Sequence, residues 1–237
     1  MHAAASSGTP AAGGVNVHYA TAFGHHRDQL PINECAAWRL AFALGDPLNR
    51  IVAPCVMWSY AGEPGSLTRR LEGVSRVLDP FTAVPEQCRA AAFFDALIAQ
   101  QDRHTGNMRW DAAARALGLF DHGYAFSLPG HRCNAARFVE WRWSQVAQAL
   151  EDWEKAALQR LVIDPTLLGL DSILRPERAQ ALRVRAEHML LAGELLPPAS
   201  CSYAPPGRPC TFLTRPQPTV RAQFELPDQG EPLGCSP

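Results

Sequence analysis

The segments QDRHTGN (residues 101–107) and LFDHG (residues 119–123) determine our interpretation of this sequence. The residues between them form two short hydrophobic runs, which predicts a β-hairpin. A hairpin returns the end of its second strand to the start of its first strand. Asp121 is therefore expected to lie beside Asn107 in the folded chain.

These residue types at this spacing suit phosphoryl transfer. That reaction needs a carboxylate that orients the attacking hydroxyl and accepts its proton, and oxygen ligands that hold Mg²⁺ against the nucleotide phosphates. In kinases an Asp, an Asn five residues later and an Asp beyond a hairpin supply these groups. Asp102, Asn107 and Asp121 have this order and spacing, and Gly123 fits the turn that follows the last aspartate. They predict the catalytic and metal-binding half of a kinase-type site.

An ordinary structural explanation exists for the same residues. Asp102 and Asn107 could simply cap turns after a helix, as Asp and Asn often do. That explanation does not account for the Asp121-x-Gly123 partner at hairpin distance, so the functional hypothesis is preferred. His122 either coordinates a ligand or only fills the variable middle position of this turn.

The sequence also resembles a known family. DRHTGN (102–107) followed by FDHGYAF (120–126) resembles the catalytic and metal-binding loops of the phosphatidylinositol 3-/4-kinase-like superfamily, including bacterial HipA-type kinases. NECAAWRLA (33–41) resembles the helix whose glutamate pairs with the nucleotide-binding lysine, and RAEHML (185–190) resembles the C-terminal lobe of actinobacterial members. The similarity extends over roughly residues 15–196, but only the central loops have the specificity of a motif.

The resemblance implies a fold and a set of roles. The fold would be α+β, a protein-kinase-like bilobal fold with an abbreviated N-lobe and a mainly helical C-lobe. ATP and Mg²⁺ would be the cofactors, with Asp102 as catalytic base, His104 as a helper near the transferring phosphate, and Asn107 and Asp121 as magnesium ligands. Residues 71–74 would lie near the adenine. The acceptor would be a hydroxyl of a protein or small molecule.

The nucleotide-binding end departs from the family pattern. The family has a lysine on a strand before the glutamate-bearing helix, where it contacts phosphates and pairs with that glutamate. Lys155 is the only lysine of this chain, so Glu34 lacks the usual partner. His18 on the first expected strand, or Arg27 in the following loop, could take that place. A glycine-rich phosphate loop is not evident either, since the glycines at 8–14 lie in a low-complexity leader.

Two other hypotheses stay open for this reason. A catalytically impaired pseudokinase would keep the fold and bind nucleotide weakly or serve as an interaction module. A helical structural protein, in which the motif is accidental, is the third possibility. Binding of ATP with Mg²⁺ separates the first two hypotheses from the third.

Hydrophobic spacing predicts a small sheet with one helix, followed by a mainly helical part. The sequence EPG at residues 63–65 predicts a turn between two antiparallel strands. The expected strands are 15–23, 51–60, 66–71, 108–110 and 117–120, and the expected helices are 32–44, 85–101, 145–162 and 176–192. The domain boundaries predicted from this pattern are a disordered leader at 1–14, an abbreviated N-lobe at 15–74, a C-lobe at 75–196 and a disordered proline-rich tail at 197–237.

The amino-acid composition and net charge of the chain do not favour any particular class of binding partner. With 237 residues and a net charge of -1, the chain gives no sign of a basic nucleic-acid surface. Its seven cysteines form no CxxC pair, which argues against a zinc site and a disulfide framework. The sequence contains no uninterrupted run of about 18 apolar residues, so it does not predict a membrane span. We expect a cytoplasmic protein.

Two local clusters have ordinary explanations. The Trp141-Arg142-Trp143 run resembles a stacking patch for nucleic acid, but its place near a helix start favours packing. His25 and His26 adjoin Arg27, and a solvated turn is favoured over a metal site because no cysteine or carboxylate stands at ligand spacing.

Overall fold

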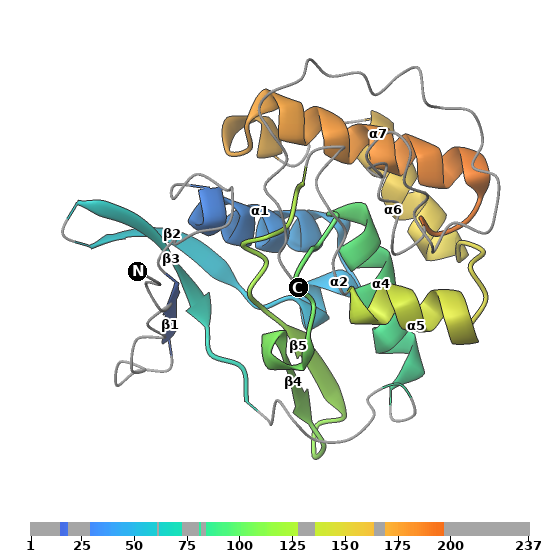
Figure 1. Cartoon of the computed structure of the whole chain (residues 1–237), viewed down its shortest axis with the longest axis horizontal. Helices are drawn as coiled ribbons and strands as arrows, with labels where there is room; N and C mark the ends of the chain where they lie inside the picture. Colours follow the sequence, from blue (N-terminus) through green and yellow to red (C-terminus); the bar gives the residue numbers. More distant parts are fainter. Residues whose placement is uncertain are drawn as a thin grey trace, which may run out of the picture.

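A computed structural model of the chain describes residues 15–18, 29–60, 62–72, 81, 84–127, 136–163 and 169–196. The predicted leader and tail lie outside these ranges, as do residues 19–23 of the first expected strand and the His25-His26-Arg27 segment. The described residues combine helices with two small antiparallel sheets, so the α+β class is confirmed. Figure 1 shows a sheet-bearing part at the left and a mainly helical part at the right.

The N-terminal sheet has three antiparallel strands in the order β1-β3-β2. They are β1 (Val15–His18), β2 (Cys55–Tyr60) and β3 (Glu63–Arg69). The predicted turn at residues 63–65 is wrong. Tyr60 of β2 pairs with Glu63 of β3, so the connection between the two strands is at residues 61–62. Gly62 supplies the positive φ of 84° that a tight turn needs.

Pro64 is tolerated inside β3 because of where β1 ends. A proline lacks the N–H that a central strand donates. Among the described strands, β1 pairs only with residues 66–69 of β3, so it does not reach Pro64. At Pro64, β2 is the one described strand that pairs with β3, so the missing N–H interrupts no described pairing with β1.

Helix α1 (Gln29–Leu44) packs against β2 and β3. The predicted helix at residues 32–44 is confirmed and starts three residues earlier. Its apolar face, including Ala36, Ala37 and Leu40, is fully buried. Gly45 follows the helix with a φ of 86°, a conformation that glycine adopts at low cost.

The strand expected at 51–60 begins only at Cys55, and a short helix α2 (Leu48–Ile51) comes before it. A short apolar run does not distinguish a strand from a buried helical turn by periodicity alone. Leu48 and Ile51 are both buried, and Ala53 N–H donates to the carbonyl of Leu119 at 2.9 Å. This segment therefore connects the N-terminal sheet to the hairpin formed by residues 108–119.

The helical part consists of α4 (Pro85–Leu97), α5 (Arg137–Gln145), α6 (Asp152–Ile163) and α7 (Pro176–Ala192). The predicted bounds of α7 are confirmed, with Gly193 at its end in a left-handed conformation. Helix α4 ends at Leu97, four residues earlier than predicted. Among the described residues no helix is long and apolar enough to cross a membrane.

The helix predicted at 145–162 is wrong in its first turns, since α6 begins only at Asp152. The cause is the buried guanidinium of Arg142, which is 1% exposed. It donates to the carbonyls of Ala147 at 3.3 Å and Ala149 at 3.0 Å, and it forms an ion pair with Glu154. A buried charge needs such acceptors, so these residues wrap around Arg142 instead of continuing a helix.

The two tryptophans that flank Arg142 pack as predicted. Trp141 is 9% exposed and its ring stacks on Phe81 with centroids 4.8 Å apart. Trp143 Nε1 donates to the carbonyl of Leu196 at 2.9 Å. The aromatic run is therefore part of the core.

Candidate active site

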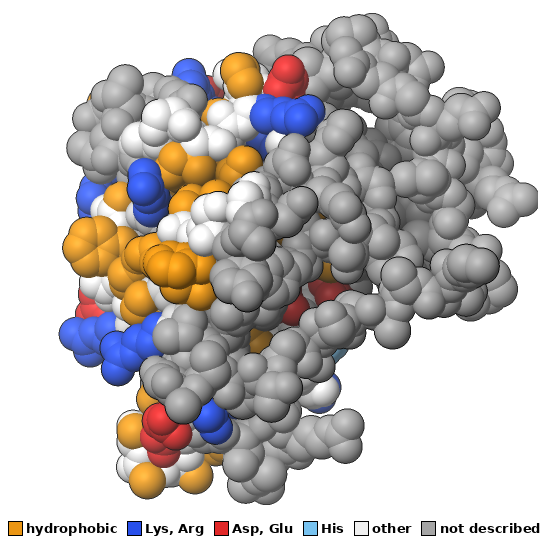
Figure 2. Space-filling view, turned by 90° about the vertical axis from the view of Figure 1, so that its left-hand side faces the viewer, with side chains coloured by type: hydrophobic (Ala, Val, Ile, Leu, Met, Phe, Trp, Pro, Cys, Tyr) orange, Lys and Arg blue, Asp and Glu red, His pale blue; other side chains and the backbone are white. Residues whose placement is uncertain are grey.

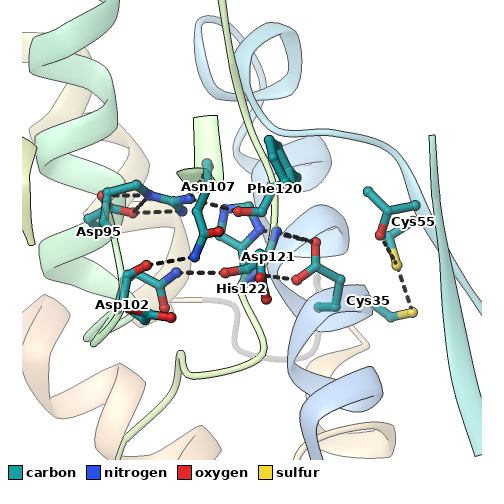
Figure 3. Close-up of polar contacts among 12 residues, drawn as sticks. Cys35, Cys55, Asp95, Asp102, Asn107, Phe120, Asp121 and His122 are labelled. Atoms are coloured by element: carbon teal, nitrogen blue, oxygen red, sulfur yellow. Dashed lines mark hydrogen bonds and ion pairs between the residues drawn. The ribbon is translucent and has the colours of Figure 1, made fainter. Parts of the chain in front are cut away.

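The second hairpin brings the predicted metal-binding residues together. Strands β4 (Met108–Asp111) and β5 (Ala116–Leu119) are antiparallel, with Met108 opposite Leu119. The N–H of Phe120 donates to the carbonyl of Asn107 at 3.3 Å. Figure 3 shows Asn107 and Asp121 next to each other, with Asp102 close by, as the spacing predicted.

Arg103 fixes the two loops to each other and to α4. Its side chain is fully buried and forms an ion pair with the buried carboxylate of Asp95, with Nε 3.1 Å from Oδ2. One of its terminal nitrogens donates to the carbonyls of Asn107 and Phe120, both at 2.7 Å. Arg103 thus binds the last residue before β4 and the first residue after β5, and it does not point to solvent.

Asn107 is oriented by the loop it ends. Its Nδ2 donates to the backbone carbonyl of Asp102 at 2.8 Å, and its side chain is almost fully buried. This bond turns the amide oxygen, Oδ1, to the opposite side. In the described part of the chain no hydrogen-bond donor is found for that oxygen, so Oδ1 remains able to accept a ligand.

Asp102 and His104 lie together at the surface end of the site. His104 Nε2 is 3.7 Å from Asp102 Oδ1, and the side chains are 54% and 43% exposed. His104 Nδ1 accepts a hydrogen bond from Gly106 N–H at 2.9 Å. In the neutral imidazole the proton then belongs on Nε2, the nitrogen that faces the Asp102 carboxylate.

The backbone of Asp121 is held in a strained conformation by bonds on both sides. Its φ is 59°, in the left-handed region that costs a non-glycine residue energy. Its N–H donates to Glu34 Oε1 at 3.0 Å, and its carbonyl accepts from Gln100 Nε2 at 2.9 Å. Strain of this kind persists where surrounding contacts fix it, and it is often found at functional sites.

Glu34 comes to this loop from α1 and is 3% exposed. Besides Asp121 N–H, its carboxylate accepts the N–H of His122, and its Oε1 lies 3.4 Å from His122 Nδ1. The sequence predicted that Glu34 faces Asp121, and this placement is confirmed. The hydrogen bonds from the loop backbone to Glu34 were not predicted from the sequence.

Asn33 is a site residue that sequence reasoning missed. Its Nδ2 donates to the carbonyls of Gly123 at 2.7 Å and Ala125 at 3.0 Å. Two consecutive residues of α1, Asn33 and Glu34, therefore hold the loop after β5. The signal available in the sequence was a polar pair in an otherwise apolar helical face.

Two arginines of α7 hold the chain just beyond this loop, and these were also missed. Arg178 donates to the carbonyl of Phe126 at 2.8 Å, and Arg185 donates to the carbonyls of Ser127 at 3.0 Å and Leu97 at 2.7 Å. Burial lowers the pKa of Arg178 to about 10 and that of Arg185 to about 9. Their seven-residue spacing, about two helical turns, places both on one face of α7.

Tyr124 shows that the two aspartates act on a common region. Burial raises the pKa of its phenol, and the negative charges of Asp102 and then Asp121 raise it further. Both carboxylates must therefore lie near one hydroxyl.

The donor set suits Mg²⁺ bound together with phosphates. Across the described ranges, no group of three or more His, Cys, Asp or Glu side chains is arranged to hold a metal ion. Mg²⁺ in kinases needs fewer protein ligands, because waters and nucleotide phosphates complete its shell. The carboxylate of Asp121 and Oδ1 of Asn107 are oxygen atoms of the kind that Mg²⁺ prefers, and the backbones of these two residues are fixed by Glu34 and Arg103.

The other predicted nucleotide contacts stay predictions. His18 ends β1, and its side chain is outside what the structure describes, as is Arg27. Of the segment expected near adenine, Leu71 packs closely against Gly118 of β5. A Cβ added to Gly118 would lie 2.5 Å from Leu71 Cδ1, so the glycine makes room for this leucine. Residues 73–74 lie outside the described ranges.

Comparisons with known proteins add little to this geometry. No protein-family profile matches the chain, and no curated protein matches it significantly. Among solved structures, the Helicobacter pylori proinflammatory kinase CtkA is similar over 73% of this chain and 82% of that chain, with 11% sequence identity and a TM-score of 0.41. A TM-score of this size supports no conclusion about function, so the proposal below rests on the residues of this chain.

Proposed function

We propose that this protein is an ATP- and Mg²⁺-dependent phosphotransferase of the kinase type, with a protein or small-molecule hydroxyl as acceptor. The observation that carries the proposal is the convergence of Asp102, Asn107 and Asp121, which the hairpin and the buried Arg103 hold together. The motif resemblance to the phosphatidylinositol 3-/4-kinase-like superfamily and its HipA-type members supports the same class of reaction.

Asp102 takes the role of the catalytic base in this proposal. Its carboxylate is partly exposed, so an acceptor hydroxyl can reach it and lose its proton to it during transfer. The N–H of His104 Nε2 orients the carboxylate or contacts the transferring phosphate.

Asn107 and Asp121 are the proposed magnesium ligands. When bound, Mg²⁺ neutralises the charge that develops on the phosphates. The contribution of this chain is rigidity, because Glu34, Gln100 and Arg103 fix the backbones of both ligands before any ligand arrives. Such preorganisation lowers the cost of binding and of reaction.

A pseudokinase remains the second candidate, and a specific observation favours it. Lys155, the only lysine of the chain, lies on α6, where its Nζ is 3.5 Å from Asp152 Oδ1. It therefore does not serve as the cation that pairs with Glu34 in the family. Binding of the phosphates would depend on another cation, for which His18 and Arg27 are the sequence candidates.

A thermal-shift measurement tests whether the site binds nucleotide. ATP with Mg²⁺ at roughly 100 times the dissociation constant should raise the melting temperature by about 5 °C or more. ATP with a chelator, and Mg²⁺ alone, are the controls and should give much smaller shifts. If ATP with Mg²⁺ gives no shift at millimolar concentration, both the kinase and the nucleotide-binding pseudokinase are wrong.

Transfer of the labelled γ-phosphate separates the two candidates. The kinase hypothesis expects label on the protein itself, on water or on a member of a panel of protein and small-molecule acceptors. Binding of Mg²⁺-ATP without any transfer would favour the pseudokinase.

A further inference from the structure

Two buried thiols meet at the junction of α1 and the N-terminal sheet. Cys35 of α1 and Cys55, the first residue of β2, are 2% and 4% exposed, and their sulfur atoms are 3.2 Å apart. Figure 3 shows the pair on the side of α1 that faces away from Asp121 and His122. Both cysteines are free thiols. A disulfide needs the sulfurs to approach by only about 1 Å more.

The surroundings make the two sulfurs unequal. Thr68 Oγ1 donates to Cys55 Sγ at 3.5 Å, which stabilises negative charge on that sulfur. The hydrogen bond with Cys55 and burial raise the pKa of Cys35. The hydroxyl donor at Cys55 therefore favours Cys55 as the sulfur that attacks an oxidant.

We propose that Cys35 and Cys55 are a redox-active pair, which hydrogen peroxide converts to a disulfide that locks α1 onto β2. The sulfur of Cys55 attacks the peroxide O–O bond and becomes a sulfenic acid, while its proton passes to the leaving hydroxide to give one water. Cys35 sulfur then attacks Cys55 sulfur and displaces a second water. In total two thiols are oxidised, one peroxide is reduced, and a thiol reductant reverses the reaction by exchange.

Peroxide can reach this pair from the edge of the sheet. Cys55 lies between Pro54, which is half-buried, and Val56, which is 59% exposed. β2 is an outer strand in the order of the three-stranded sheet. A water-sized oxidant therefore needs only a small local opening of one strand end, and such openings cost little at sheet edges.

The disulfide would restrain α1, the helix whose residues Asn33 and Glu34 bind the loop after β5. Cys35 directly follows Asn33 and Glu34, the residues that hold the loop after β5. A bond from Cys35 to β2 restrains this turn of α1 and closes a loop from residue 35 to residue 55. The inference is independent of the proposed phosphotransferase activity, because it requires neither nucleotide nor metal.

Peptide mapping of the full-length wild-type protein tests the bond directly. The native protein is treated with hydrogen peroxide, the excess is removed with catalase, remaining thiols are blocked with N-ethylmaleimide in denaturant, and the chain is cut with trypsin. Cleavage after Arg27, Arg39, Arg50 and Arg69 gives the peptides 28–39 and 51–69, each with one cysteine. We expect a linked species of these two peptides that lacks two hydrogen atoms and disappears after dithiothreitol.

A thermal measurement tests the lock. The oxidised wild type should melt about 5 to 10 °C above the reduced protein, the shift expected for a loop of this length. Cys35→Ser and Cys55→Ser should each abolish the difference, whereas Cys88→Ser, a change at a buried thiol of α4, should retain it.

Three results would overturn the proposal. They are recovery of both cysteines in alkylated form, linkage of either one to a different cysteine, and a linked wild type that melts at the temperature of the reduced protein. Peptide mapping requires no substitution, so it decides the question even if the serine variants do not fold.

Discussion

The loop region at residues 95–127 and the N-terminal sheet are built in opposite ways. In the loop region charged side chains are buried and bonded, as in the Arg103–Asp95 pair, where neither side chain is exposed. On β2 apolar side chains face outward, with Val56 59% and Trp58 50% exposed. Figure 2 shows hydrophobic side chains at the surface on this side of the molecule.

This difference explains why the approach of Asp102, Asn107 and Asp121 could be predicted from the sequence, whereas the nucleotide contacts of the N-terminal sheet stay predictions. Within the loop region Arg103 contacts Asp95, Asn107 and Phe120, all of them near it in sequence, so a short motif carries this part of the geometry. The sheet end has no comparable pattern and no lysine. Two adjacent α1 residues, Asn33 and Glu34, bind the backbone of the loop and add to the connection that Ala53 makes with Leu119.

The largest expected effect comes from the two aspartates, which have different roles in the proposal. Asp121→Ala should weaken Mg²⁺-dependent ATP binding and reduce transfer on the order of 10³-fold, because a metal ligand is lost. Asp102→Ala should reduce transfer at least ~100-fold while nucleotide affinity changes much less. Calorimetric titration with Mg²⁺-ATP and a labelled-phosphate assay measure the two quantities separately.

Asp152→Ala is the matched control, because Asp152 is a fully exposed aspartate of α6. It should change neither affinity nor rate. Equal loss of ATP affinity in the Asp102 and Asp121 variants would contradict the division of roles, and unchanged transfer in either variant would contradict the proposed site.

The next effect tests whether buried polar contacts define the loop region. Arg103→Met removes the charge that pairs with Asp95 and the donors to the carbonyls of Asn107 and Phe120. An unpaired buried carboxylate should then cost about 3–5 kcal/mol of unfolding free energy. Urea denaturation measures the loss, and Arg50→Met is the control.

Arg50 is a suitable comparison because its side chain is 77% exposed and forms its ion pair with the exposed Asp46. Its replacement should cost less than about 1 kcal/mol. A second comparison is Arg103→Met combined with Asp95→Leu, which removes both charges and should recover part of the stability. Similar losses for Arg103→Met and Arg50→Met would show that the buried pair does not stabilise the loops.

The predictable features of the chain were those with local causes. The hairpin, the approach of Asn107 to Asp121 and the bounds of α7 follow from hydrophobic spacing and from proline and glycine at helix ends. The start of α6 could not be predicted, because it depends on where Arg142 finds acceptors after burial. The same holds for Arg178 and Arg185, whose carbonyl partners are more than 50 residues away in the sequence.

The smallest effect tests the connection between the two regions at Glu34. Glu34→Gln keeps the size of the side chain but leaves one acceptor oxygen where the carboxylate has two, and both accept backbone N–H groups now. One buried N–H of Asp121 or His122 would then lack an acceptor, which should cost about 1–3 kcal/mol. Glu177→Gln, at an exposed position of α7, should cost less than about 0.5 kcal/mol. If Glu34 also fixes Asp121 for the metal, its replacement should weaken Mg²⁺-dependent ATP binding by more than the stability change alone explains, at temperatures where the variant stays folded. Loss of stability with unchanged affinity would restrict Glu34 to a structural connection, and loss of neither would show that the two regions are held together elsewhere.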